Sequence, residues 1–321
     1  MGSRRQTLID WIEQDSIAPA NVNDVLSVAG IYPSGASWLR FLDGLLLWLG
    51  ALLLAAGVIF FFAYNWNDLG RMVKFGLVEA LIVAALIVIW RTGLESLAGK
   101  VTLLATSLFV GALLALVGQT YQTGADTFEL FAAWAVLILP WVLVGRLAAL
   151  WLVWLGLLNA AVIFYYTVFG GLFGVVFGPD QLLWALFVLN VIPFVIWEML
   201  ARRSVHDRWA IRILATASGG LVTTLAIYAI FESHGQHGLG LLAWAVFFIG
   251  VYVVYRHMVL DVFVLAGGVL SVIVIVAAWM GSIVMRHSGD AGGMLLIGLV
   301  VIGLSAAGGL WLKNVVSGAK A

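Results

Sequence analysis

The 321 residues of this chain are 64% hydrophobic and only 10% charged, whereas a soluble domain is roughly half apolar and about a quarter charged. No soluble fold could bury so much apolar surface, so the composition indicates a membrane protein. The formal net charge is +0, which argues against nucleic-acid binding because that function needs a basic excess. Cysteine is absent, which excludes disulfides, thiolate nucleophiles and Cys-ligated metal centres.

Residues 1–43 form the one segment of mixed composition. Leu8, Trp11 and Ile12 fit one face of a short helix, and Pro19 suits the start of a second. So short a pair buries little core by itself. We therefore expect a helical cytoplasmic lead that docks on the membrane surface or on a partner.

Residues 44–321 contain a succession of apolar runs. About 20 mostly apolar residues cross the hydrocarbon of a bilayer as a helix, which satisfies its own backbone polar groups there. The predicted fold class is therefore all-α, a polytopic transmembrane helical bundle of about ten spans with an outer Gly-rich connection at 170–178. The expected spans are 44–64, 73–91, 101–118, 128–145, 147–168, 181–200, 209–231, 239–255, 258–281 and 292–315.

The distribution of basic residues predicts the orientation of these spans, because cytoplasmic loops carry the excess of Lys and Arg. With ten spans and the N-terminus inside, all but three of the 16 basic residues fall on the cytoplasmic side. The three exceptions are Arg71, Lys74 and Arg286. Both termini are thus predicted to be cytoplasmic.

Two of the predicted outer turns are rich in aromatic, amide and acidic residues. Such groups bind sugars or polar head groups, because amides and carboxylates supply paired donors and acceptors and Tyr supplies a flat apolar face. We expect an outward-facing pocket lined by these turns and by the helix after the first of them. The candidate residues are Asn65, Trp66, Asp68, Lys74, Glu79, Gln119, Tyr121, Gln122, Asp126 and Glu129.

Two alternatives stay open for these residues. The aromatic residues can mark the interfacial belt, and Asp126 can cap the next helix with Glu129 in the capping-box position. Glu79 lies on the order of 9 Å below the outer end of its helix, where an ionisable group indicates function or a buried partner. Lys74 or Arg71 could be that partner.

The loop after the seventh span contains Glu232, His234 and His237. The His-x-x-His spacing permits shared metal ligation, but a catalytic zinc needs three oriented ligands and a second shell. A solvated loop is the alternative, and we expect neither a metal nor another cofactor.

Polar and small residues within the spans predict helix packing. Asn159 and Asn190 lie mid-span and are expected to form hydrogen bonds between helices. The pairs Gly219-Gly220, Gly267-Gly268 and Gly308-Gly309 are expected to let helices approach closely.

Two stretches carry a family resemblance. The first runs from Gly50 through Tyr64, Asn65 and Trp66 to Lys74, and the second from Gly111 through Gln119 and Asp126 to Trp134. They resemble the bacterial predicted-membrane-protein family DUF2157, a domain of unknown function, over about residues 1 to 150. The resemblance implies a bacterial inner-membrane location, and it supplies no activity and no catalytic residues.

The sequence contains no recognisable nucleophile–base pair and no phosphate-binding loop, so we expect a protein that is not an enzyme. The leading hypothesis is binding or transport of a small polar or lipid-linked molecule through the outward-facing pocket. One alternative is a scaffold or accessory subunit with an envelope-complex partner or a second copy of itself. Another is a membrane-embedded metal-dependent hydrolase that uses the Glu232, His234 and His237 loop. Under all three hypotheses the protein is embedded in a lipid bilayer, which is its expected partner.

Overall fold

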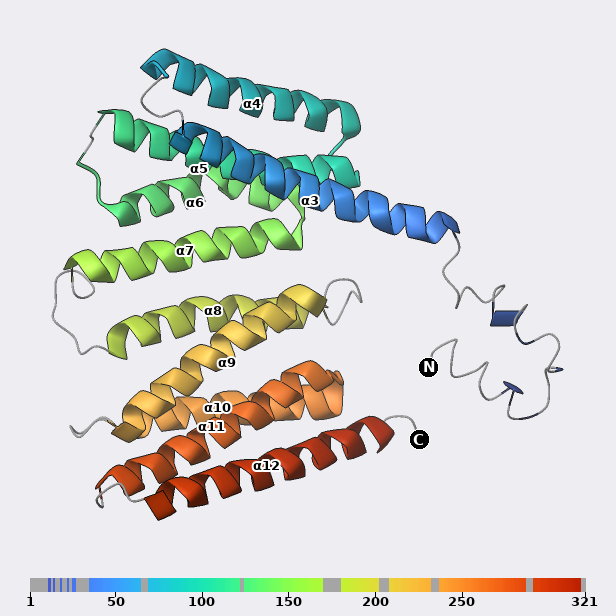
Figure 1. The fold of residues 1–321 in the computed structure, drawn as a ribbon, viewed down its shortest axis with the longest axis vertical. Coiled ribbons are helices and arrows are strands. Elements are labelled where there is room, and N and C mark those ends of the chain that lie inside the picture. Colours follow the sequence, from blue (N-terminus) through green and yellow to red (C-terminus); the bar gives the residue numbers. More distant parts are fainter. Residues whose placement is uncertain are drawn as a thin grey trace. The chain divides into compact units, whose positions relative to one another are not determined.

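The computed structural model describes residues 35–64, 69–121, 124–169, 180–201, 208–231, 237–286 and 291–318, with a few single positions before residue 35. These residues form helices, and no strand occurs among them (Figure 1). The helices are α3 (Gly35–Tyr64), α4 (Arg71–Thr92), α5 (Leu97–Tyr121), α6 (Thr127–Gly145), α7 (Ala148–Phe169), α8 (Asp180–Ala201), α9 (Arg208–Phe231), α10 (His237–Val253), the π-helical turn η3 (Val254–Met258), α11 (Val262–Arg286) and α12 (Ala291–Gly318).

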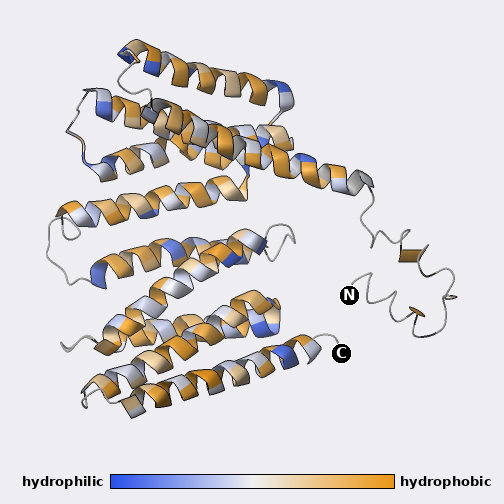
Figure 2. Cartoon of the chain, viewed as in Figure 1, coloured by the Kyte–Doolittle hydropathy of each residue, from blue (hydrophilic) through white to orange (hydrophobic). Residues whose placement is uncertain are grey.

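The predicted membrane character is confirmed. Within the described ranges, nine helices are long and apolar enough to cross a bilayer, and hydrophobic residues run along their lengths in Figure 2. The remaining predicted span, 44–64, lies in α3, which begins earlier, at Gly35. The lead predicted for residues 1–43 otherwise falls almost entirely outside the described residues, as does the Gly-rich connection at 170–178.

Local chemistry explains two of the helix boundaries. The predicted break between the fourth and fifth spans is confirmed, because α6 ends at Gly145 and Arg146 adopts a left-handed conformation (φ 44°) before α7 begins. The predicted start of the ninth span at residue 258 is wrong. Asp261 precedes the first residue of α11 and accepts a hydrogen bond from the N–H of Phe263 (3.1 Å), which is the geometry of an N-cap.

The contacts between helices divide the described chain into two units. The N-terminal unit contains α3, α4 and α5, and the C-terminal unit contains most of α6 together with α7 to α12. In the N-terminal unit α5 packs against both α4 and α3. Its core includes Val58, Val78 and Phe109.

In the C-terminal unit, α9 is the central helix and packs against α7, α8, α10 and α11. The largest core cluster joins Ile211 and Leu214 of α9 to Tyr255 of η3 and Val264 of α11. The last turn of α8, the first turn of α9, η3 and the start of α11 therefore meet at one end of this unit.

The hydrogen bonding between helices that was predicted for the mid-span asparagines is confirmed, and the structure shows that the two are each other's partners. Asn190 of α8 donates to Asn159 Oδ1 of α7 (2.6 Å), and Asn159 donates back to Asn190 Oδ1 (3.3 Å). Each amide also donates to a carbonyl one turn earlier in its own helix. The two helices, α7 and α8, are thus joined by two hydrogen bonds between their asparagine side chains.

The predicted close packing at glycine pairs holds for only some positions. Gly308 of α12 lies directly against Val269 of α11, where a Cβ would overlap that side chain, and the prediction is confirmed there. In the other two pairs one glycine packs against Phe248 of α10, whereas the other member, Gly220 or Gly267, faces open space. Neighbouring positions on a helix point about 100° apart, so both members of a pair cannot face the same neighbour.

Candidate functional site

Five polar side chains meet at the end of the C-terminal unit described above, and we call them the charged cluster. Glu198 comes from the last turn of α8, Arg208 and Arg212 from the first turns of α9, Tyr255 from η3, and Asp261 from the cap of α11. The two carboxylates and two guanidinium groups balance in charge. Ionised groups so placed are costly unless they are paired.

Asp261 is the centre of one half of the cluster. Its side chain is almost completely buried, and Oδ2 lies 3.2 Å from Arg208 Nε and 3.0 Å from Arg212 Nε. Since Oδ1 caps α11, both oxygens of this carboxylate have donors. Asp261 therefore ties the start of α9 to the start of α11.

Glu198 is the centre of the other half, and its partners leave one oxygen unused. Its Oε2 accepts a hydrogen bond from Tyr255 Oη (2.7 Å) and lies 3.6 Å from Arg208 Nη2. The Arg208 guanidinium also lies over the Tyr255 ring, 5.8 Å from its centroid. Within the described part of the chain, Glu198 Oε1 and Arg208 Nη2 are buried and form no hydrogen bond.

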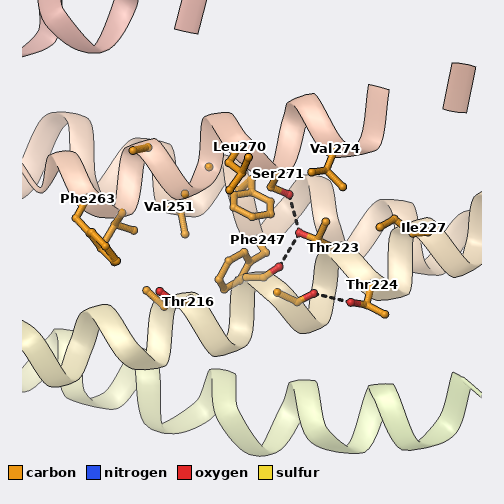
Figure 3. A pocket seen from close by; sticks show the side chains of 18 residues that line it. Thr216, Thr223, Thr224, Ile227, Phe247, Val251, Phe263, Leu270, Ser271 and Val274 are labelled. Carbon is orange, nitrogen blue, oxygen red and sulfur yellow. Dashed lines mark hydrogen bonds between the residues drawn. The ribbon is translucent and has the colours of Figure 1, made fainter. Parts of the chain in front are cut away.

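A cavity of about 570 Å³ lies between α9, α10 and α11 (Figure 3); we call it the α9–α11 cavity. Phe247 and Val251 of α10 line it together with residues of α9 and α11. Thr224 and Leu270 also line it and are exposed, so the cavity opens at the side of the unit.

The hydroxyl groups on the walls of this cavity are bonded to one another and to the backbone (Figure 3). Thr223 donates its one hydroxyl proton to the carbonyl of Gly219 (2.6 Å). The Ser271 hydroxyl, 2.6 Å away, must therefore donate to Thr223, and it accepts in turn from Trp244 Nε1 (2.8 Å). Thr216 and Thr224 likewise donate to carbonyls one turn earlier. The donors of the cavity wall are already used, and its lining is otherwise apolar.

A second cavity, of about 500 Å³, lies between α8 and α10, and we call it the α8–α10 cavity. Phe187, Phe194 and Val246 are among its apolar lining residues. Glu198 and Tyr255 also line it, so this cavity reaches the charged cluster.

The residues predicted to line an outward-facing pocket lie in different surroundings. Asn65, Trp66, Asp68 and Gln122 fall outside the described residues. In the N-terminal unit, Lys74 is buried in α4, whereas Glu79, Gln119 and Tyr121 are exposed. Lys74 and Glu79 are five residues apart, about 140° around the helix, so they lie on different sides of α4.

The two remaining candidates belong to α6 in the C-terminal unit. Asp126 occupies the N-cap position, as expected, and its carbonyl accepts the N–H of Glu129 (3.0 Å). The expected capping box is wrong in one respect, because the Asp126 side chain forms no capping hydrogen bond. Asp126 and Glu129 are both exposed.

No group of three or more His, Cys, Asp or Glu side chains that could hold a metal ion occurs among the residues the structure describes. Two of the sequence candidates, Glu232 and His234, lie outside that part of the chain. His237 is the first residue of α10.

The charged cluster was not predicted from the sequence. Glu198 lies near the end of an expected span, and Asp261 was placed inside another. A usable signal existed, since each carboxylate stands within a few residues of the arginine-rich side of the predicted topology. Acidic residues at such positions indicate a buried pair or a functional site.

The described helices and buried polar groups define the class of this molecule as a helical membrane protein with several apolar spans. Residues 9–151 match the family described as "Predicted membrane protein (DUF2157)", so the resemblance inferred from the sequence is confirmed over the N-terminal part of the chain. No curated protein and no solved structure significantly matches the chain. The charged cluster and both cavities lie beyond the matched residues.

Proposed function

We propose that this protein is not an enzyme and binds an amphiphile whose apolar chain occupies the α9–α11 cavity. The observation that carries the proposal is the hydroxyl network of Thr223, Ser271 and Trp244, which is complete within the protein. The cavity volume of about 570 Å³ falls within the range of roughly 300 to 1,000 Å³ typical of small-molecule sites.

The chemistry of the lining favours an apolar occupant over a sugar or an ion. A sugar entering the cavity would lose hydrogen bonds to water and find few free donors, and each unpaired polar group in an apolar site is costly. A hydrocarbon chain forms no hydrogen bonds to water, so it loses none when it enters the cavity. Gly220 and Gly267, which face open space, leave room for such a chain along the cavity wall.

The same proposal includes a location and an orientation. We place the protein in a bacterial inner membrane because residues 9–151 match the DUF2157 family. Both termini are placed in the cytoplasm because this orientation puts the arginines at the start of α9 on the cytoplasmic side, as the positive-inside rule requires. The α9–α11 cavity then lies within the hydrocarbon region above the charged cluster. In this placement the side opening of the cavity faces the hydrocarbon region of the bilayer, from which a lipid chain can enter.

The test uses a glycine substitution that fills the cavity. In Gly267→Leu the new side chain enters the α9–α11 cavity without meeting another atom at its Cβ. Gly281→Leu is the matched control, because it lies on the same helix, also faces open space and does not line this cavity. Both variants replace glycine by a better helix former, so neither should unfold α11.

The measurement is electron paramagnetic resonance of a spin-labelled stearoyl phosphatidylcholine in vesicles that contain the protein. We expect an immobilised lipid fraction with the wild type that decreases in Gly267→Leu and is retained in Gly281→Leu. Equal immobilised fractions in all three proteins would refute the proposed function.

A further inference from the structure

We propose that the α8–α10 cavity is a second binding site, for an amphiphile with a protonated primary amine as its head group. Glu198 Oε1 would accept the N–H groups of the amine, and the apolar tail would lie between α8 and α10. The proposal goes beyond the function proposed above, because it concerns another cavity and a different recognition chemistry.

The first step of the argument is the unused oxygen of Glu198. This residue is only 5% exposed, and it lines the α8–α10 cavity. Tyr255 and Arg208 both approach Oε2, while Oε1 accepts no hydrogen bond from the described residues. Buried carboxylate oxygens are almost always hydrogen-bonded, so an unused one beside a cavity points to an absent donor.

The second step concerns the sign of the charge that the site favours. Asp261 interacts with both arginines through their Nε atoms, at 3.0 and 3.2 Å. Among the described residues, Glu198 has one cationic partner, Arg208, at the longer distance of 3.6 Å. Within the described residues, the Glu198 carboxylate is therefore less fully compensated than that of Asp261, which favours a cationic donor at Oε1. Arg208 Nη2, which also lacks a hydrogen bond, lies beside the other oxygen, Oε2.

The third step is the way in which the protein fixes the carboxylate. The π-helical turn η3 brings Tyr255 into the core, where it is 1% exposed and its ring lies against that of Phe194 (centroids 6.5 Å apart). π-Helical turns are frequent at functional sites. The Tyr255 hydroxyl fixes Oε2, and Oε1 keeps both of its acceptor positions for a further donor.

The fourth step is the shape and lining of the cavity. Its volume is about 500 Å³, and apart from the Glu198 and Tyr255 end its lining is formed by apolar side chains such as Phe187, Val246 and Leu242. A site with one polar end and an apolar body matches an alkylammonium ion. A quaternary ammonium ion has the same charge but no N–H, and a fatty acid anion has the opposite charge.

The experiment measures thermal unfolding of the full chain in detergent with three probes of equal chain length, namely decylammonium, decyltrimethylammonium and decanoate. We expect decylammonium to raise the midpoint of unfolding by at least about 3 °C more than the other two at a saturating concentration. Equal shifts with decylammonium and decyltrimethylammonium would overturn the proposal. The same result is expected if a water molecule alone satisfies Oε1, so that outcome also counts against it.

Two variants locate the effect. Gly250→Leu fills the α8–α10 cavity without touching the charged cluster, since Gly250 lines the cavity and faces open space. Gly238→Leu, on the same helix, faces open space and does not line the cavity. The preference for decylammonium should disappear in Gly250→Leu and persist in Gly238→Leu. A preference that survives in Gly250→Leu would refute the assignment to this cavity.

A third variant tests the carboxylate. Glu198→Gln keeps an oxygen for Tyr255 but removes the negative charge, so we expect the preference for decylammonium to be lost. Should this variant unfold because Arg208 loses one of its two carboxylate partners, the result with Gly250→Leu still decides the proposal. The spin-label experiment on Gly267→Leu concerns the α9–α11 cavity, so the two proposals can fail separately.

Discussion

The ion pair between described residues of the N-terminal unit is exposed, whereas those of the C-terminal unit have buried carboxylates. In the N-terminal unit, Lys100 and Glu95 form an ion pair at 3.8 Å, and the Glu95 side chain is 86% exposed. In the C-terminal unit, the carboxylates of Glu198 and Asp261 are buried, and they pair with arginines from a different helix. The Lys100–Glu95 pair lies within a few residues of chain, whereas Asp261 pairs with arginines that are 53 and 49 residues away in the sequence.

This difference predicts different energetic roles. An exposed ion pair contributes little, because water and salt screen it and the side chains lose freedom when they pair. Removing one member of a buried pair is far more costly, because the remaining charge stays buried without compensation. The charged cluster should therefore hold α8, α9 and α11 together, whereas the Lys100–Glu95 pair should not matter for the fold.

The largest effect is expected for Asp261→Ala. This substitution leaves two arginines without their shared carboxylate and removes the cap of α11. Loss of a buried partner typically costs about 3 to 5 kcal/mol, and we expect about 3 kcal/mol because the arginine side chains are partly exposed. Equilibrium unfolding in mixed detergent micelles measures this loss.

The matched control is Asp261→Asn, which keeps the capping oxygen and removes the charge. It should fall between the wild type and Asp261→Ala. If Asp261→Ala is no less stable than the wild type, the charged cluster does not hold the helices together.

Tyr255→Phe should have the next largest effect. The ring and its contact with Phe194 stay in place, but Glu198 Oε2 loses its hydrogen bond of 2.7 Å. A hydrogen bond to a charged group contributes about 1.5 to 3 kcal/mol, so a loss of about 2 kcal/mol is expected in the same unfolding assay. A change of less than about 0.5 kcal/mol would show that this bond contributes little to stability, contrary to the expectation from the desolvation of Glu198.

Asn190→Ala should have a smaller effect. It breaks both hydrogen bonds with Asn159, and bonds between helices in membrane proteins contribute about 0.6 kcal/mol on average and at most about 1.7. We expect a loss of about 1 kcal/mol. A double-mutant cycle with Asn159→Ala gives the coupling energy, and strict additivity of the two single losses would mean that the bonds do not couple α7 to α8.

Much of the fold follows from the sequence because each span is a local feature. An apolar run of sufficient length indicates a helix by itself, so each of the ten expected spans corresponds to a helix of the structure, although some boundaries differ by several residues. The break at Gly145 and Arg146 was also visible, since a basic residue interrupts the apolar pattern there. Hydrogen bonding of each mid-span asparagine to another helix follows from the sequence because an amide in a membrane span has few other partners. That the two asparagines pair with each other does not.

The charged cluster could not be predicted in the same way, because its partners are far apart in the sequence. The arginines at 208 and 212 carried information about orientation, yet nothing local indicated that Asp261 lies between them. The polar turns near Trp66 and Gln119 are conspicuous in the sequence because their polar residues are neighbours in the chain. Cavities cannot be predicted from glycines in the sequence, because a glycine can lie against a neighbouring helix, as Gly308 does, or face open space, as Gly267 does. Only the three-dimensional packing of the helices decides which.

The smallest effect is expected for Glu95→Gln, and it tests the other side of the comparison. The substitution removes the Lys100 ion pair while keeping the size of the side chain, and exposed pairs typically contribute about 0.2 to 1 kcal/mol. We expect a loss below about 0.5 kcal/mol, and even this loss should shrink in high salt because exposed charges are screened. A loss as large as that of Tyr255→Phe would mean that the N-terminal unit also depends on paired charge, and the contrast between the two units would then be wrong.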